Sequence, residues 1–405
     1  MVGKTVLFQM ILVIGSTSGL VGADWLQFRG NHIDGVSTER IAPISLKTIS
    51  WKATLPGRGL SGPIVIGDRV VVTSSTGYKQ NRLHVLCFDA GSGKQLWHRQ
   101  FWATGRTQSH PKMCGATPTP ASDGERIFAF YSSNDVACLD LDGNLLWFRG
   151  LTHDYPNASN SLGMASSPIV VEDTLIVQVE NEAESFATGL DVRTGIPRWK
   201  QNRPRHANWT TPTILPRPKH SPLVVLQSTT GLSAINPKTG RDVWRYNKSA
   251  ASIPSSVISS SRIIYVPSGG LTALVSQQNG SPRELWHQNR LSPSMASPLV
   301  VRDRVYVTNR AGVVTAADAR TGKTLWRMRL KGPFSGTPVS VGGRLYFFNE
   351  KGLGQAVKPE SSRGRLVETI NLAETVLCTP AIANGALYIR SDGVGHDGHL
   401  WKIGK

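Results

Sequence analysis

Long polar segments between the apolar runs of this chain carry the residues that could bind a charged ligand. The longest are residues 99–116, 149–166 and 200–210, and loops beyond about 12 residues in a compact fold are often functional. Arginines hold anions through paired N–H groups, and an indole can stack on a sugar ring. We therefore predict an anionic-ligand site with ordinary loop packing as the alternative; its candidates are Arg58, Arg106, His110, Lys112, Arg205, His206 and Trp209.

Signals of metal binding or catalysis are weak in this sequence. The four cysteines, Cys87, Cys114, Cys138 and Cys378, form no CxxC motif and no adjacent pair. His396 and His399 stand in a Gly-rich turn, where they would supply at most half of a metal site. The sequence contains no GxSxG, Walker or HExxH motif. We predict no catalytic residue and no metal site.

The first 23 residues are typical of a signal peptide. Lys4 precedes an apolar run, Val6 to Ile14, that is too short to span a bilayer, and Val21-Gly22-Ala23 offers small residues for cleavage. Asp24 follows where a lipid-anchored protein would carry Cys. We therefore expect export to the periplasm or cell exterior, without a lipid anchor or transmembrane segment.

The charge balance is strongly basic. The formal net charge is +18 at pH 7, and Lys4 is the only charged residue among the first 23. Such a charge favours acidic partners such as an anionic polysaccharide. Because the basic residues are scattered rather than clustered, solubility is the alternative explanation. Export makes nucleic acid an unsuitable partner.

A repeated unit organises the chain. Each unit has an apolar run, a short turn, a second run, a third strand ending near Asp, a Gly turn and a closing Trp. The units start at Pro63, Pro118, Pro168, Pro212, Pro254, Pro298, Pro338 and Pro380. These prolines are 55, 50, 44, 42, 44, 40 and 42 residues apart, which matches four-stranded propeller blades of roughly 40–45 residues.

The repeat predicts an all-β, eight-bladed β-propeller over residues 48–405, with four-stranded antiparallel blades. Residues 24–47 form an N-terminal leader segment. The eighth unit ends after its third strand, so Thr48 to Leu55 should supply its fourth and close the ring. The tryptophans should fill the gaps between blades; they are Trp51, Trp97, Trp147, Trp199, Trp244, Trp286 and Trp326. The seventh unit has Ile370 where Trp is expected.

Equivalent positions of two units hold Cys87 and Cys138, each two residues before an Asp. Facing sheets pack about 10 Å apart, whereas a disulfide needs Cα atoms within about 7 Å. We predict two buried thiols.

The units VVTAADARTGKTLW and LHVLCFDAGSGKQLW resemble the PQQ-like (pyrroloquinoline quinone) propeller repeat, and the resemblance covers about residues 48 to 405. It implies one of two functional branches. Quinoprotein dehydrogenases bind pyrroloquinoline quinone and usually calcium over the propeller axis, whereas other members, of the outer-membrane-assembly type, are non-enzymatic scaffolds.

The site residues favour the scaffold. Many alcohol-oxidising quinoproteins carry adjacent cysteines, which this sequence lacks, and we match none of their calcium-binding or catalytic residues. We expect a non-catalytic, monomeric scaffold without cofactors that binds a protein partner or an anionic glycan at the channel mouth. The alternatives are a PQQ-dependent oxidoreductase acting on a sugar or alcohol, with quinone and calcium, and a binder of acidic polysaccharide.

Overall fold

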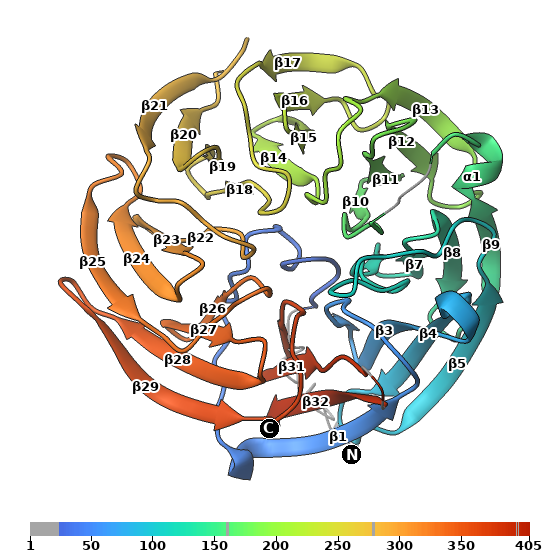
Figure 1. Cartoon of the computed structure of the whole chain (residues 1–405), viewed down its shortest axis with the longest axis horizontal. Helices are drawn as coiled ribbons and strands as arrows, with labels where there is room; N and C mark the ends of the chain where they lie inside the picture. Colours follow the sequence, from blue (N-terminus) through green and yellow to red (C-terminus); the bar gives the residue numbers. More distant parts are fainter. Residues whose placement is uncertain (1–23, 159–161, 278–279, 394, 396) are drawn as a thin grey trace, which may run out of the picture.

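The computed structural model describes residues 24–158, 162–277, 280–393, 395 and 397–405. These residues form eight four-stranded antiparallel sheets, placed radially around a central axis (Figure 1). The predicted all-β, eight-bladed propeller is confirmed. The predicted signal peptide, residues 1–23, lies outside the described residues.

Blades 1 to 4 follow one another along the chain. Blade 1 holds β2 (Ile64–Ile66), β3 (Arg69–Thr76), β4 (Arg82–Asp89) and β5 (Gln95–Trp102). Blade 2 holds β6 (Ala121–Ser122), β7 (Arg126–Phe130), β8 (Asp135–Asp140) and β9 (Leu145–Gly150). Blade 3 holds β10 (Ile169–Val171), β11 (Thr174–Val179), β12 (Phe186–Asp191) and β13 (Pro197–Asn202). Blade 4 holds β14 (Thr213–Arg217), β15 (His220–Ser228), β16 (Gly231–Ile235) and β17 (Asp242–Tyr246).

Blades 5 to 7 repeat this order, and blade 8 combines both ends of the chain. Blade 5 holds β18 (Val257–Ile258), β19 (Ile263–Pro267), β20 (Leu271–Val275) and β21 (Arg283–Gln288). Blade 6 holds β22 (Leu299–Val301), β23 (Arg304–Thr308), β24 (Val313–Asp318) and β25 (Thr324–Arg329). Blade 7 holds β26 (Val339–Val341), β27 (Arg344–Phe348), β28 (Leu353–Pro359) and β29 (Gly364–Asn371). Blade 8 holds β30 (Ala381–Ala383), β31 (Ala386–Arg390), β32 (Gly398–Gly404) and β1 (Ile49–Leu55).

Helical structure is limited to three short pieces in the described residues: η1 (Leu46–Thr48), η2 (Tyr78–Gln80) and α1 (Leu151–Asp154). None of the described helices has the length and apolar character that crossing a membrane requires.

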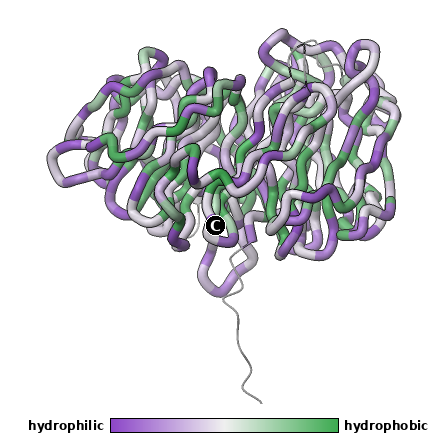
Figure 2. Tube along the Cα trace, turned by 90° about the horizontal axis from the view of Figure 1, so that it is seen from below, coloured by the Kyte–Doolittle hydropathy of each residue, from purple (hydrophilic) through white to green (hydrophobic). Residues whose placement is uncertain are grey.

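Burial within each blade increases toward the axis. In blade 6, β23 is buried at four of its five positions, whereas the outer strand β25 is exposed at most of its positions. The middle strands are covered on both sides by neighbouring blades, so they consist of continuous β-branched and aromatic runs. In side view, hydrophobic stretches run through the body of the ring and many connecting loops are hydrophilic (Figure 2).

Outer-strand tryptophans tie most blades to the next. Trp97 donates its indole N–H to the carbonyl of Leu141 at 2.9 Å, in a turn of the following blade. A Cβ at Gly143 would lie 2.6 Å from the Trp97 ring, so this turn requires glycine, which also adopts φ 83° there. Further indole donors, each to a carbonyl of the next blade, are Trp51, Trp147, Trp199, Trp286 and Trp326.

The ring closes through β1, as predicted. Trp51 pairs with Lys402 and Leu55 pairs with Gly398, so the N-terminal strand is the outer strand of blade 8. The structure corrects the expectation for blade 7. Trp326 of blade 6 faces Ala316, and the matching residue opposite Ala356 in blade 7 is Glu368 rather than Ile370.

The replacement of Trp by Glu368 has a physical cause. Blade 8 takes its outer strand from the other end of the chain, so it has no hairpin turn whose carbonyl an indole could reach. The leader passes there instead, and the Glu368 carboxylate accepts the backbone N–H of Ile44 at 2.9 Å. Blade 7 therefore needs a hydrogen-bond acceptor at this position, whereas the indoles at the matching position of other blades are hydrogen-bond donors.

The two faces of the ring differ in their connections. One face, called here the turn face, carries the tight turns between the first and second and between the third and fourth strands of each blade. The opposite face, called the loop face, carries the long connections from one blade to the next, including residues 103–120 and 151–168.

The leader crosses the turn face from blade to blade, visible as the blue trace through the middle of the ring (Figure 1). Trp25 exchanges two backbone hydrogen bonds with Val65 of blade 1, and Gly35 accepts the Ser340 N–H of blade 7. Between them, Arg29 is buried and donates to the carbonyl of Ser256 at 2.8 Å. Burial lowers the pKa of Arg29 to about 10. The leader therefore covers the central axis on this face.

Candidate functional site

A belt of hydroxyls encircles the axis at the loop face, just before the first strand of each blade. The backbone N–H of Ser167 donates to the Thr211 hydroxyl at 3.0 Å, and the N–H of Thr211 donates to the Ser255 hydroxyl at 2.9 Å. Each blade is thereby linked to the next. The belt hydroxyls belong to Thr119, Ser167, Thr211, Ser255, Ser297, Thr337 and Thr379.

The belt lacks a hydroxyl in blade 1, and the belt residues correct the starting positions assigned to two of the repeat units. Blade 1 has Gly62 in place of Ser or Thr, and a Cβ there would lie 2.7 Å from the Thr379 carbonyl, so only glycine fits. In blade 2 the belt residue is Thr119, so Pro120 rather than Pro118 is the equivalent of Pro63. In blade 5 the same phase places Ser256 there instead of Pro254.

A second ring lies two residues before the belt. Because alternate residues of an extended chain project to the same side, the position two before each belt residue also lines the axis. This rim ring contains Leu60, Thr117, Ala165, Trp209, Ile253, Met295, Ser335 and Leu377. Five of these eight are large apolar side chains. The rim ring is therefore mainly hydrophobic.

The two rings enclose a cavity of about 340 Å³, called here the mouth. Phe28 of the leader reaches it, and the loops that follow blades 1 and 2 add Met113 and Leu162. Three apolar side chains of the mouth are solvent-exposed: Leu162 by 44%, Met295 by 41% and Ile253 by 37%. An exposed apolar ring of this kind is typical of a contact site for another molecule.

Three of the seven predicted ligand residues line the mouth: His110, Lys112 and Trp209. Trp209 is fixed by an indole N–H···O bond of 2.9 Å to the carbonyl of Gly163. Lys112 forms an ion pair of 3.0 Å with Glu350 of blade 7. The charged loop residues that reach the mouth therefore already have partners inside the protein.

Arg58 holds the loop face together. Its guanidinium pairs with the fully buried carboxylate of Asp392 at 2.6 Å and donates to the carbonyls of Pro111 and Met113. Hydrogen bonding and the Asp392 charge raise the pKa of Arg58 against the opposing effect of burial. Arg58 thus joins blade 8 to the loop that follows blade 1.

The other predicted residues lie outside the mouth lining. Arg106 donates to the side chain of Gln108 at 2.5 Å, and Arg205 and His206 are exposed on the loop after blade 3. The structure therefore does not bring the seven residues into one basic pocket. Their role in ligand binding stays a prediction.

The apolar residues that dominate the mouth are not among the predicted ligand residues. Ile253, Met295 and Leu377 carry no charge and sit beside turn-forming residues, so they attract no attention as ligands. Their signal was positional, because each stands two residues before a repeated Ser or Thr. Phe28 gives no such signal, since only the docking of the leader brings it to the axis.

A pair of histidines, buried His84 and exposed His98, lies near the loop face of blade 1. His84 Nδ1 and His98 Nε2 are 2.8 Å apart, and the Thr76 hydroxyl contacts the other ring nitrogen of His84 at 2.7 Å. Burial, then the neighbouring His98 and Arg82, lowers the pKa of His84 to about 4. Burial also lowers the pKa of His98. Both shifts favour the neutral form of the rings.

The described residues of the mouth do not fit calcium-bound pyrroloquinoline quinone. Calcium prefers six to eight oxygen ligands, with carboxylates prominent among them, and the described mouth lining contains no Asp or Glu. The belt hydroxyls already accept backbone N–H groups. Across the part of the chain that the structure describes, no three His, Cys, Asp or Glu residues come together as a metal site would require. All four cysteines are buried and unpaired.

Structural relatives share the propeller. A europium-containing methanol dehydrogenase superposes with a TM-score of 0.74 at 13% identity, covering 95% of this chain and 98% of that one. BamB from Moraxella catarrhalis gives a TM-score of 0.63 at 17% identity, covering 87% of this chain and 97% of that one. At these identities the likeness shows the fold alone.

Comparisons of the sequence identify the family, which the shared fold alone does not. An outer membrane protein assembly factor BamB of Burkholderia pseudomallei (strain K96243) is 26% identical over 321 residues, covering 75% of this chain and 74% of that protein. A family model described as "Outer membrane protein assembly factor BamB" matches residues 44–201, 81–311, 269–367 and 310–404. These matches span nearly the whole propeller, and the chain belongs to this PQQ-like propeller family.

Proposed function

We propose that this chain is a non-catalytic interaction scaffold of the periplasm or cell exterior, which holds a protein partner at its loop-face mouth. The observation that carries the proposal is the exposed apolar ring. Leu162, Ile253 and Met295 are each more than a third exposed around a cavity of about 340 Å³. Protein interfaces place apolar and aromatic residues at such a centre, inside a polar rim.

The chemistry of the mouth favours a protein over an anionic glycan at this position. The mouth offers apolar side chains and an occupied hydroxyl belt, and its one lining lysine is paired with Glu350. A protruding apolar side chain of a partner would lose water on entering, whereas a sugar acid would find the one lining lysine already paired with Glu350. The relatives named as assembly factors support this choice.

A site-specific cross-linking experiment tests the proposal. A photoreactive benzoyl-phenylalanine at Ile253 or Met295 should give one discrete cross-linked protein in the native host. The same group at Leu325, 37% exposed on the outer strand β25, is the matched control and should not. The substitution Leu162→Asp should abolish the product. Cross-links that are equal at all three positions would contradict the proposal.

The alternative is a PQQ-dependent oxidoreductase acting on a sugar or alcohol. We retain it because the dehydrogenases share the propeller fold. The purified chain, supplied with pyrroloquinoline quinone and calcium, is assayed for dye reduction with alcohols and aldoses. We expect no turnover above a heat-treated sample. Sustained turnover that requires both additions would establish the enzyme instead.

A further inference from the structure

A second cavity, of about 1020 Å³, lies on the turn face beneath the leader. Its walls come from the first turns of blades 5, 6 and 7, a turn of blade 7 after β28, and leader residues 34–41. It is separate from the mouth, because the two cavities share no lining residue. Its size exceeds that of a single sugar or phosphate and suits a larger ligand.

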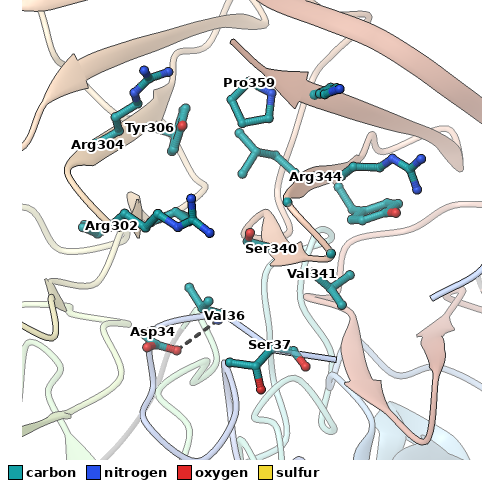
Figure 3. A pocket seen from close by; sticks show the side chains of 18 of the residues that line it. Asp34, Val36, Ser37, Arg302, Arg304, Tyr306, Ser340, Val341, Arg344 and Pro359 are labelled. Carbon is teal, nitrogen blue, oxygen red and sulfur yellow. Dashed lines mark hydrogen bonds between the residues drawn. The ribbon is translucent and has the colours of Figure 1, made fainter. Parts of the chain in front are cut away.

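The cavity carries cations that are not engaged within the protein. Arg40, Arg302 and Lys358 line it, and the side chain of none of the three makes a hydrogen bond or ion pair with another described residue. Figure 3 shows the guanidinium of Arg302 extending into the open space between the leader and the Tyr306–Pro359 side. Arg344, by contrast, pairs with Glu368 at 3.2 Å.

The acidic residues of the walls are mostly occupied. Asp34 accepts the backbone N–H of Val36 at 3.0 Å, and Glu39 accepts the N–H of Gly385 at 2.9 Å. Glu360 pairs with Arg363 and with a second arginine of β29. Asp303 is the remaining carboxylate, and it is solvent-exposed. Accepting a backbone N–H leaves the charges of Asp34 and Glu39 in place, so the five cations of the lining exceed its four carboxylates by one.

The local backbone keeps this space open. The turn of blade 7 has Gly342 and Gly343, and a Cβ at Gly343 would meet nothing within 4 Å. The matching turn of blade 6 has Arg302 at φ 56°, a left-handed conformation that glycine or asparagine adopts more readily. One turn thus leaves the cavity empty, and its neighbour places a long cation in it.

Hydroxyls complete the walls. Ser37, Ser259, Ser260 and Ser340 line the cavity with Tyr306. Guanidinium groups bind carboxylates through two parallel hydrogen bonds, and hydroxyls are suited to the remaining oxygens of a sugar. We propose that this cavity is a binding site for an acidic oligosaccharide, independent of the partner site at the mouth.

Calorimetric titration of the full chain with a carboxylated sugar chain, oligogalacturonate, tests the site. Cellotetraose supplies a neutral sugar of similar length, and inorganic phosphate supplies the charge alone. We expect binding of oligogalacturonate that weakens at least tenfold between low and high salt, with little binding of the other two. Equal binding of cellotetraose, or phosphate binding that displaces the sugar at similar concentration, would overturn the proposal.

Variants locate the binding on the turn face. Arg302→Asn removes the cation and keeps a residue suited to the left-handed backbone, so thermal stability should be unchanged while affinity falls at least tenfold. Lys358→Gln should weaken binding by a smaller factor. Arg310→Ala, an exposed arginine on the loop face of the same blade, removes an equal charge and should change affinity less than twofold. Similar losses in Arg302→Asn and Arg310→Ala would mean nonspecific charge attraction and would overturn the site.

Discussion

The turn face and the loop face are built from the same eight blades, yet they join neighbouring blades in different ways. On the turn face, indole rings such as Trp97 reach the next blade, lie against a turn glycine and donate to a carbonyl. On the loop face, backbone N–H groups donate to hydroxyls such as Thr211. Large apolar contacts dominate the first junction, and single hydrogen bonds dominate the second.

Because of this difference, the residues that hold the blades together are not the residues that form the two cavities' open surfaces. The turn-face junction packs an indole ring, buried or half-buried, against the next blade in every blade but the seventh. Short turns therefore suffice there, and the surface is left to charged residues. The loop-face junction needs only one residue per blade, which leaves long loops free to vary. An apolar mouth and a basic cavity can therefore lie on opposite faces of one ring.

The largest effect is expected where the turn-face junction is cut. Trp326 is 5% exposed and donates to the Glu360 carbonyl at 3.2 Å. Trp326→Ala should lower the free energy of unfolding by about 3–5 kcal/mol, measured by denaturant unfolding. Trp102→Ala, at a residue 59% exposed, is the control and should stay within about 0.5 kcal/mol. Equal effects would mean that the indole junction is not what joins the blades.

The strongest loop-face effect should come from Arg58. Arg58→Ala leaves the fully buried carboxylate of Asp392 without its cation, which should cost about 3 kcal/mol of unfolding free energy. Lys112→Ala breaks an ion pair whose lysine is 60% exposed and should cost less than about 1 kcal/mol. If the two variants were equally stable in denaturant unfolding, Arg58 would be a surface charge rather than a structural link.

Acid should weaken the protein through the histidine pair. Burial lowers the pKa of His84 to about 4. Between pH 6.5 and 4, this histidine is therefore protonated in the unfolded chain and mostly neutral in the folded chain. Stability is therefore full above pH 6.5 and falls by about 2 kcal/mol as the pH approaches 4. Unfolding midpoints at pH 7.5 and 4.5 should differ less in His84→Gln than in the parent. His206→Gln, at an exposed ring, should leave the difference unchanged; a parental pH dependence in His84→Gln would exclude the pair as its source.

The smallest effect is expected in the hydroxyl belt. Thr337→Val keeps the shape of the side chain but removes the acceptor for the Ser297 N–H, which bonds it at 3.2 Å. The loss should be about 1–2 kcal/mol, with faster hydrogen exchange at the Ser297 amide. Thr324→Val, on the exposed outer strand, should change neither quantity. An unaltered Ser297 exchange rate would show that water replaces the belt hydroxyl.

The repeats along the chain are enough to predict the architecture. The number of blades, their four strands and the closure through Trp51 follow from repeated Pro, Gly and Trp positions, because these residues act on the local backbone and on the adjacent blade. The same repeat also marks the rim ring, because its residues stand two positions before each belt residue. It also misplaced single residues, taking Ile370 for the Trp position that Glu368 occupies, because one irregular blade cannot be aligned without its pairing partner.

The chemistry of the two cavities depends on contacts between segments that are distant in the chain. Phe28, Met295 and Leu377 are far apart in the chain and meet because the ring closes around the leader. Arg58, a predicted ligand residue, also links blade 8 to the loop after blade 1 because Asp392 lies beside it. Which charges remain unengaged depends on three-dimensional neighbours, since an ion pair forms over a few ångströms of space and not along the sequence.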